Sequence, residues 1–218
     1  MSEWLLVWHF VDGDRRLFRN GGHHGRAKKI RKNQTLHVEP PLTMCKRGLH
    51  GSVLPLDALE YVPRGHLGRI VVCRCEVWGE MERQSDKVCA EYRKALWWAD
   101  CTTALHEFAC DEAERALALT DNPDPRSIAA ITTKRRWLCG EATDAERAAA
   151  RDAAWDAAWA AAWDAARAAA WAAARAAAWD AARDAAWAAA RDAARDAARA
   201  AQNERLAARL EALHKEDK

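Results

Sequence analysis

The chain has 218 residues, of which 50% are hydrophobic and 30% charged, and its formal net charge is +2. Charged residues recur along the whole chain, so no apolar stretch of about 20 residues is expected to span a membrane. The first residues lack the basic segment of a secretory signal peptide, and the seven cysteines are an odd number. A cytoplasmic protein with reduced thiols is therefore expected.

The first part of the chain, residues 1–98, is predicted to form an α+β domain. Its strands are indicated by alternating apolar and polar residues and by the frequency of Val, Leu, Trp and Phe. The expected strands are Glu3–Phe10, Gln34–Glu39, Arg69–Glu80 and Val88–Trp98. A short helix is expected over Pro55–Tyr61, and loops are expected at Asn20-Gly-Gly, Pro40-Pro41, Pro63-Arg-Gly and Gly79.

The cysteines of the third predicted strand, together with Cys45 and His50, are candidate zinc ligands. Cys73 and Cys75 alternate with Arg74, so both thiols fall on the same apolar strand face as Val71 and Val77. Zinc-binding cysteine pairs are usually separated by two to four residues on a knuckle. The two thiols are therefore expected to be buried as small hydrophobic groups, and neither a metal nor a cofactor is expected.

Residues 99–142 are predicted to form a helical connector of two helices. Apolar residues recur at helical spacing from Leu105 to Leu117, and this helix should end before Asn122-Pro123-Asp124-Pro125. Ser127 is expected to cap the second helix, which should run through Trp137. Thr143 and Glu146 then form a capping-box pattern that marks the start of a third helical segment.

Residues 143–214 are predicted to form a long alanine-rich helix built on a four-residue repeat. From Arg147 to Arg199 every fourth residue is Arg or Trp, and only Ala and Asp lie between them. Four residues advance a helix by about 400°, so each repeat drifts by about 40° around the axis. A coiled coil needs a period close to 3.5 residues. The repeat therefore does not predict an ordinary zipper.

The repeat is the first candidate for a functional site. Tryptophans that wind around a helix expose more apolar area than a monomer normally leaves in water, and arginines four residues away can lie against their rings. This pattern indicates a surface for another protein or for a second copy of the chain. The candidate partner-binding residues are Trp155, Trp159, Trp163, Trp171, Trp179, Trp187, Arg167, Arg175, Arg183 and Arg191.

A basic loop near the start of the chain is the second candidate. Residues 20–33 carry no acidic side chain, which is typical of a solvated loop or of a surface that contacts phosphate. The candidate anion-binding residues are Arg26, Lys28, Lys29, Arg31 and Lys32. This loop predicts nucleic-acid or nucleotide binding as the alternative function.

The α+β part resembles a small domain of unknown function found in bacterial and phage proteins, over about residues 3–98. The matching segments are Cys45-Lys-Arg-Gly48-Leu49-His50-Gly51-Ser52, Leu56-Asp57-Ala58-Leu59-Glu60-Tyr61, Gly79-Glu80 and Asp86-Lys87. Gly51 stands where that pattern has Ala. This resemblance implies a fold but no activity.

The connector and the start of the repeat, roughly Phe108 to Trp155, are similar to a helical immunity-protein family associated with bacterial toxin systems. The matching segments are Phe108-Ala-Cys110-Asp-Glu-Ala-Glu114, Pro125-Arg126-Ser-Ile-Ala-Ala130, Arg136-Trp137 and Gly140-Glu141. The resemblance implies inhibition by direct protein binding. The regular Trp and Arg residues depart from that family and leave the partner open.

The sequence therefore favours a non-enzymatic, immunity-like or phage accessory protein that binds a partner through its repeat helix. A less favoured alternative is enzymatic, because His50-Gly51-Ser52 is similar to the H-G-[ST] strand of certain ADP-ribosyltransferases. That chemistry would need a downstream tyrosine and a catalytic glutamate, for which Tyr61, Tyr92 and Glu114 lack a convincing spacing. A catalytic role requires His50 and a carboxylate to converge in a deep pocket.

Overall fold

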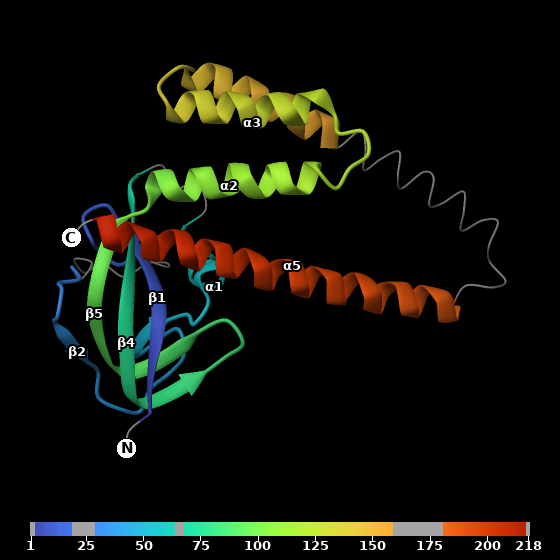
Figure 1. Cartoon of the computed structure of the whole chain (residues 1–218). Helices are drawn as coiled ribbons and strands as arrows, with labels where there is room; N and C mark the ends of the chain where they lie inside the picture. Colours follow the sequence, from blue (N-terminus) through green and yellow to red (C-terminus); the bar gives the residue numbers. More distant parts are fainter. Residues whose placement is uncertain (1–2, 19–28, 64–67, 159–180, 217–218) are drawn as a thin grey trace. The chain divides into compact units, whose positions relative to one another are not determined.

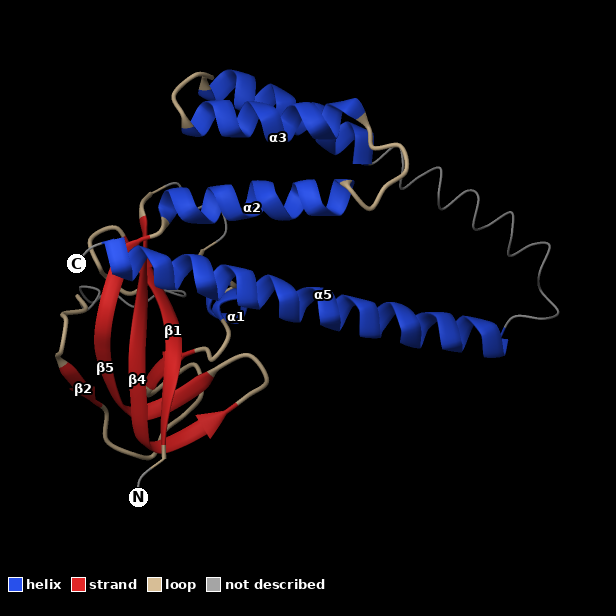
Figure 2. Ribbon diagram, in the orientation of Figure 1, coloured by secondary structure: helices blue, strands red, loops and turns tan. Residues whose placement is uncertain are grey.

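The fold is an α+β arrangement with a helical region and a C-terminal helix (Figures 1 and 2). The computed structural model describes residues 3–18, 29–63, 68–158 and 181–216, and it describes the side chains of the last range from 192 to 215. The chain divides into two compact units: unit 1 comprises Met1–Ala104 and Ala201–Lys218, and unit 2 comprises Leu105–Ala200.

Unit 1 is built on a five-stranded antiparallel sheet in the order β1-β4-β5-β2, with β3 also paired to β5. The strands are β1 (Trp4–Asp12), β2 (Thr35–His37), β3 (Leu49–Gly51), β4 (Ile70–Arg83) and β5 (Val88–Asp100), and α1 (Pro55–Leu59) follows β3. The predicted strands and the predicted short helix are therefore confirmed within a few residues, whereas β3 was not expected.

The sheet bends back on itself at β3. Ser52, which follows β3, exchanges two backbone hydrogen bonds with Trp8 of β1, at N···O distances of 2.7 and 3.0 Å. Gly51 permits this approach, because a Cβ at that position would lie 2.4 Å from Cγ2 of Val7. β3 thus connects the two outer parts of the sheet and brings β1, β5 and α1 around one cavity.

The core of unit 1 lies on one face of the β1–β4–β5 sheet. Cys73 and Cys75 are fully buried there together with Val71 and Val77, as the alternation of this strand predicts. Burial raises the pKa of both thiols, since a thiolate would lose its hydration among apolar neighbours. These two cysteines are packing residues.

The end of α5 (Ala181–Glu216) is part of unit 1. Leu206 and Leu210 are fully buried, and Glu211 lies 3.4 Å from the guanidinium of Arg74 on β4. His214 stacks on Trp97 of β5, with ring centroids 4.8 Å apart. The last turns of the chain thus complete the fold of its first hundred residues, which differs from the expected division at residue 98 into consecutive domains.

Unit 2 contains α2 (Thr102–Leu117) from Leu105 onward, α3 (Pro125–Leu138) and a helix over residues 144–158. The capping box is confirmed: the Glu146 carboxylate accepts from the backbone N–H of Thr143, and the backbone N–H of Glu146 donates to the Thr143 hydroxyl. The assignment of Ser127 as a cap is wrong. Asp124 caps α3 because Pro125 fits the first helical position, where no N–H is needed.

Gly79 is a second correction. It lies inside β4 rather than in a loop, and it has a φ of 86° where the register with β5 shifts between Trp78 and Met81. A positive φ in a strand is typical of a β-bulge, for which glycine is the least strained residue.

Residues 159–180 of the four-residue repeat lie outside the residues that the structure describes. The helix over 144–158 includes its first members, and α5 includes its last members. In the described part of the chain, no helix is long and apolar enough to cross a membrane.

Candidate functional site

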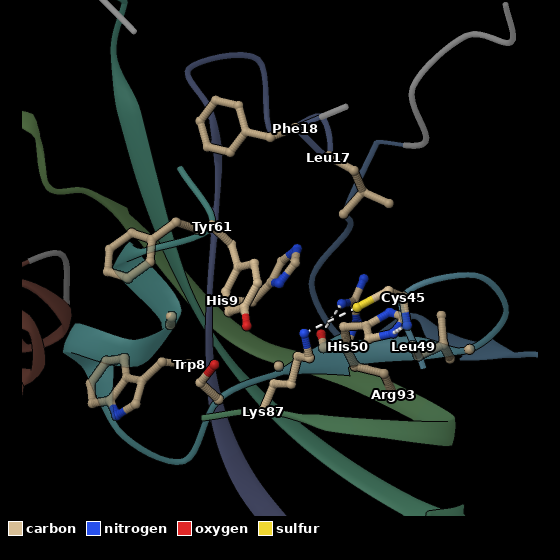
Figure 3. A pocket seen from close by; sticks show the side chains of 15 residues that line it. Trp8, His9, Leu17, Phe18, Cys45, Leu49, His50, Tyr61, Lys87 and Arg93 are labelled. Carbon is tan, nitrogen blue, oxygen red and sulfur yellow. Dashed lines mark hydrogen bonds between the residues drawn. The ribbon is translucent and has the colours of Figure 1, made fainter. Parts of the chain in front are cut away.

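Unit 1 contains a cavity of about 230 Å³ at the place where β1, β3 and α1 meet (Figure 3). It is lined by 15 residues, which combine aromatic side chains with four nitrogen-bearing ones. Cys45, His50 and Arg93 lie together on one side of the cavity, and Trp8 lies on the other side in this view.

Arg93 of β5 is the central polar residue. Its exposed fraction is only 3%, since it points from the sheet toward the core side, opposite Val77. One guanidinium nitrogen, Nη1, donates to the carbonyl of His50 at 2.7 Å, whereas Nη2 is buried with no hydrogen-bond partner. Among the described residues, no carboxylate pairs with this guanidinium. A buried cation without a counter-ion costs several kcal/mol, so an anion beside this guanidinium would be stabilised.

His9 of β1 contributes a second unsatisfied nitrogen. Its Nε2 atom is buried without a hydrogen-bond partner. Burial lowers the pKa of His9 well below its usual value of 6.5, and the charges of Arg93 and His50 lower it further. The ring is therefore neutral at pH 7 and available to a ligand as a hydrogen-bonding group.

His50 of β3 is held in place by the turn before it. The backbone N–H of Cys45 donates to its Nε2 at 2.9 Å, so Nε2 carries no proton and the ring is in its Nδ1–H form. Burial lowers the pKa of His50, as do the charges of Arg93 and Lys87, while a backbone hydrogen bond at Gly48 and the charge of Glu82 act in the opposite direction. His50 therefore organises the cavity wall as a neutral acceptor.

Lys87 closes the same side of the cavity. Its ammonium donates to the sulfur of Cys45 at 3.0 Å and lies 5.0 Å from the ring centroid of Tyr61. The hydrogen bonds to Cys45 and to Tyr61 raise the pKa of Lys87. The Tyr61 hydroxyl donates to Asp86, so the residue pair Asp86-Lys87 holds two lining residues of the cavity, Tyr61 through Asp86 and Cys45 through Lys87.

The remaining walls are mostly apolar. They are formed by Trp8, Phe10, Leu17, Phe18, Leu49 and Ala58. A site of this composition suits a small molecule with an apolar or aromatic body and one anionic group. Among the described residues that line it, none is an aspartate or a glutamate.

The absence of a lining carboxylate bears on the enzymatic alternative. His50 and Tyr61 do meet in the cavity, but Tyr92 does not line it, since it stacks between Trp78 and His37 on the sheet. Glu114 belongs to unit 2. The required convergence of His50 with a carboxylate is therefore not found among the described lining residues. Within the described ranges, no group of three or more His, Cys, Asp or Glu residues is arranged to hold a metal ion.

The structure describes few of the predicted partner-binding residues. Trp155 is 66% exposed on the helix over 144–158. Trp187, Arg183 and Arg191 fall on α5 where only the backbone is described. Trp159, Trp163, Arg167, Trp171, Arg175 and Trp179 lie outside the described residues.

The described residues of the predicted basic loop do not line the cavity. Lys29, Arg31 and Lys32 are exposed, and none of them lines the cavity. Arg26 and Lys28 lie outside the described residues. The cationic groups that the structure brings together are Arg93 and Lys87, and the candidate list omitted both.

The sequence carries a weak signal for these two residues. Lys87 belongs to the Asp86-Lys87 pair of the resemblance, and Arg93 is a charged residue within an apolar strand. The side of the sheet that Arg93 occupies depends on register shifts in β4–β5 pairing, one of them between Arg74 and Cys75. A period of two residues does not predict such shifts.

Comparison with known proteins adds no family. No family model, curated protein or solved structure matches this chain. The fold and the site thus define the class of unit 1 as an α+β unit with a cationic, aromatic-walled cavity, and the cavity is the basis for its function.

Proposed function

We propose that unit 1 binds a small molecule that carries a phosphate or carboxylate group on an apolar body. The observation that carries this proposal is the buried guanidinium of Arg93, with Nη2 unpartnered and no described carboxylate beside it. An anion bound at this position would supply both the missing hydrogen bond and the missing counter-charge.

The surroundings of Arg93 support the same ligand chemistry. Lys87 adds a second positive charge at the opening, and His9 offers a buried nitrogen without a partner. The aromatic walls, which include Trp8 and Tyr61, provide area for a flat or apolar body. A volume of about 230 Å³ limits the ligand to a small molecule.

The test is isothermal titration calorimetry of the full chain with inorganic phosphate and with phenyl phosphate at pH 8. Both anions should bind, and phenyl phosphate should bind more tightly because its ring buries apolar surface. Arg93→Met should weaken binding by at least about tenfold, because it removes a charge-assisted hydrogen bond. Lys87→Met, at the half-buried opening, should weaken it by a smaller factor.

Arg74→Met is the matched control, since Arg74 is a half-buried arginine of the same sheet that does not itself line the cavity; it packs on Trp8, a wall residue, and pairs with Glu211. It should leave both affinities unchanged. If Arg93→Met does not fold, the Lys87 variant decides the question. No heat of binding from either anion with the native chain would contradict the proposal. Tight, steeply salt-dependent binding of a single-stranded oligonucleotide would favour the nucleic-acid alternative.

A second function is proposed for unit 2, namely binding of a protein partner through the Trp/Arg repeat, with inhibition as the outcome. The exposure of Trp155 favours it, since an indole with 66% of its surface in water gains free energy when a partner covers it. The resemblance implies another protein as the partner, and the tryptophan pattern of the repeat also suits a second copy of this chain.

Sedimentation velocity over a range of protein concentrations tests the second copy. Self-association through the repeat should raise the weight-average mass, and Trp155→Ala should reduce it. Leu119→Ala is the matched control, since Leu119 is 89% exposed on the same unit and is not part of the repeat. A monomer at all concentrations would exclude the second copy as the occupant.

A further inference from the structure

Cys45 is an exposed thiol at the edge of the cavity. It lies in a turn that two backbone hydrogen bonds of 2.8 Å between Thr43 and Arg47 close. Its φ is 64°, a left-handed conformation that is uncommon for a residue with a side chain. The hydrogen bond from its backbone N–H to His50 fixes this conformation.

The turn directs the sulfur toward a positive charge. The Lys87 ammonium lies 3.0 Å from the Cys45 Sγ atom, close enough for a hydrogen bond to sulfur (Figure 3). A thiolate is the nucleophilic form of cysteine, and a neighbouring ammonium stabilises it. Cys139, the other exposed cysteine, lies at the C-terminal end of α3 and has no such hydrogen bond described.

The same wall of the cavity holds the unpartnered guanidinium. Arg93 donates to the carbonyl of His50, and the His50 ring accepts from the backbone N–H of Cys45, so His50 contacts both the residue that bears the thiol and the proposed anion site. An electrophile that placed its anionic group on Arg93 would therefore have its reactive carbon held near a nucleophilic sulfur, which raises the effective concentration of one for the other.

We propose that Cys45 is a nucleophilic thiol that reacts preferentially with small electrophiles carrying a carboxylate or phosphate group. This inference rests on the proposed anion binding at Arg93. In the reaction the Cys45 sulfur forms a bond to the electrophilic carbon, and the bond from that carbon to its leaving group breaks. The leaving group departs with the bonding electron pair, and the thiol proton passes to water. No oxidant or reductant is needed.

Two reagents of equal size test the preference. Iodoacetate carries a carboxylate, iodoacetamide carries a neutral amide, and both alkylate thiols with release of iodide. The full chain is treated with each reagent at pH 7.5, and the rates at Cys45 and Cys139 are followed by peptide mass spectrometry. The matched control is thus a second exposed thiol in the same molecule.

Cys45 should react with iodoacetate about tenfold faster than Cys139 does, whereas iodoacetamide should show a smaller difference between the two thiols. Lys87→Met should bring the Cys45 rate close to that of Cys139. Phenyl phosphate should slow the reaction of Cys45 with iodoacetate and leave Cys139 unchanged.

Equal rates at the two cysteines with both reagents would overturn the inference. A fast Cys45 with no preference for iodoacetate would also overturn it, because the anionic group would then play no part. Either result together with calorimetric binding of phosphate would leave the proposed function standing. Failure of both experiments would remove both proposals.

Discussion

The two units of this chain are stabilised in different ways. Unit 1 depends on pairing between strands that are distant in the sequence and on packing of the C-terminal end of α5. Its core therefore includes residues from both ends of the chain. Unit 2 depends on helix propensity and on ion pairs between neighbouring helices. Arg135 of α3, for example, pairs with Asp111 of α2 at 2.9 Å and with Glu114 of α2 at 2.8 Å. α3 has no buried residue.

This contrast explains where a cavity can form. A sheet that bends at β3 places side chains from several strands around one buried space, and Arg93 is buried there with its Nη2 atom unpartnered. The helices of unit 2, which exposed ion pairs hold together, present exposed side chains such as Trp155 to the solvent. We therefore associate small-ligand binding with unit 1 and partner binding with unit 2.

The largest expected effect comes from the C-terminal helix. The double substitution Leu206→Ala and Leu210→Ala should destabilise unit 1 by about 2–5 kcal/mol per site, because both side chains are fully buried. Urea unfolding followed by near-ultraviolet circular dichroism measures this change. Leu119→Ala, at an exposed position, should change stability by less than about 0.5 kcal/mol. An unchanged midpoint in the double variant would show that α5 is dispensable for unit 1.

Trp137 tests the local stabilisation of unit 2. Its indole N–H donates to Asp144 at 3.0 Å, and the Lys134 and Arg147 side chains lie 4.1 and 4.3 Å from its ring centroid. Trp137→Ala should cost about 2 kcal/mol, since the side chain is half-buried. Hydrogen exchange should increase in α2 and α3 but not in the strands of unit 1. Equal loss of protection in both units would contradict their independence.

The decrease in the free energy of unfolding at acidic pH should depend on His9. Its pKa in the folded state is lowered below the ordinary 6.5, so the unfolded chain binds the extra proton first as the pH falls. Stability is therefore full above about pH 6.5 and declines below it by about 1.4 kcal/mol per pH unit until the folded-state pKa is reached. Chemical denaturation from pH 8 to pH 5 measures this slope. His9→Phe should flatten it, with the remaining slope partly due to His50; an unaltered slope would refute the assignment.

The smallest expected effect concerns the cap of α3. Asp124→Ala should lower the stability of this helix by about 1 kcal/mol, because the carboxylate accepts from the backbone N–H of Arg126 at 2.8 Å. Ser127→Ala should have almost no effect, although the sequence pattern alone favoured Ser127. Amide exchange in the first turn of α3 distinguishes the two variants. The reverse order of effects would restore the original assignment.

Sequence reasoning succeeded where structure depends on neighbouring residues. The strand alternation around Cys73 and Cys75 and the capping box at Thr143 were both predicted, since each follows from short-range periodicity or a local hydrogen bond. It failed at Gly79, which lies at a register shift inside β4 and not in a loop. It also failed at Ser127, because Pro125 begins α3 earlier and Asp124 is the cap. Leu206 and Leu210 are four residues apart, a helical spacing that predicts a buried stripe but does not identify what covers it.

The sequence by itself determined the α+β class of the first part, the capped helices and the alanine-rich repeat, because propensity and periodicity act over a few residues. Tertiary structure alone decided that Ala201–Lys218 joins unit 1 and that Arg93, His9, His50 and Lys87 surround one cavity. These residues are far apart along the chain, and their approach depends on sheet register and on the bend at β3. Neither property is encoded in any short segment, since both arise when the whole core minimises its exposed apolar surface.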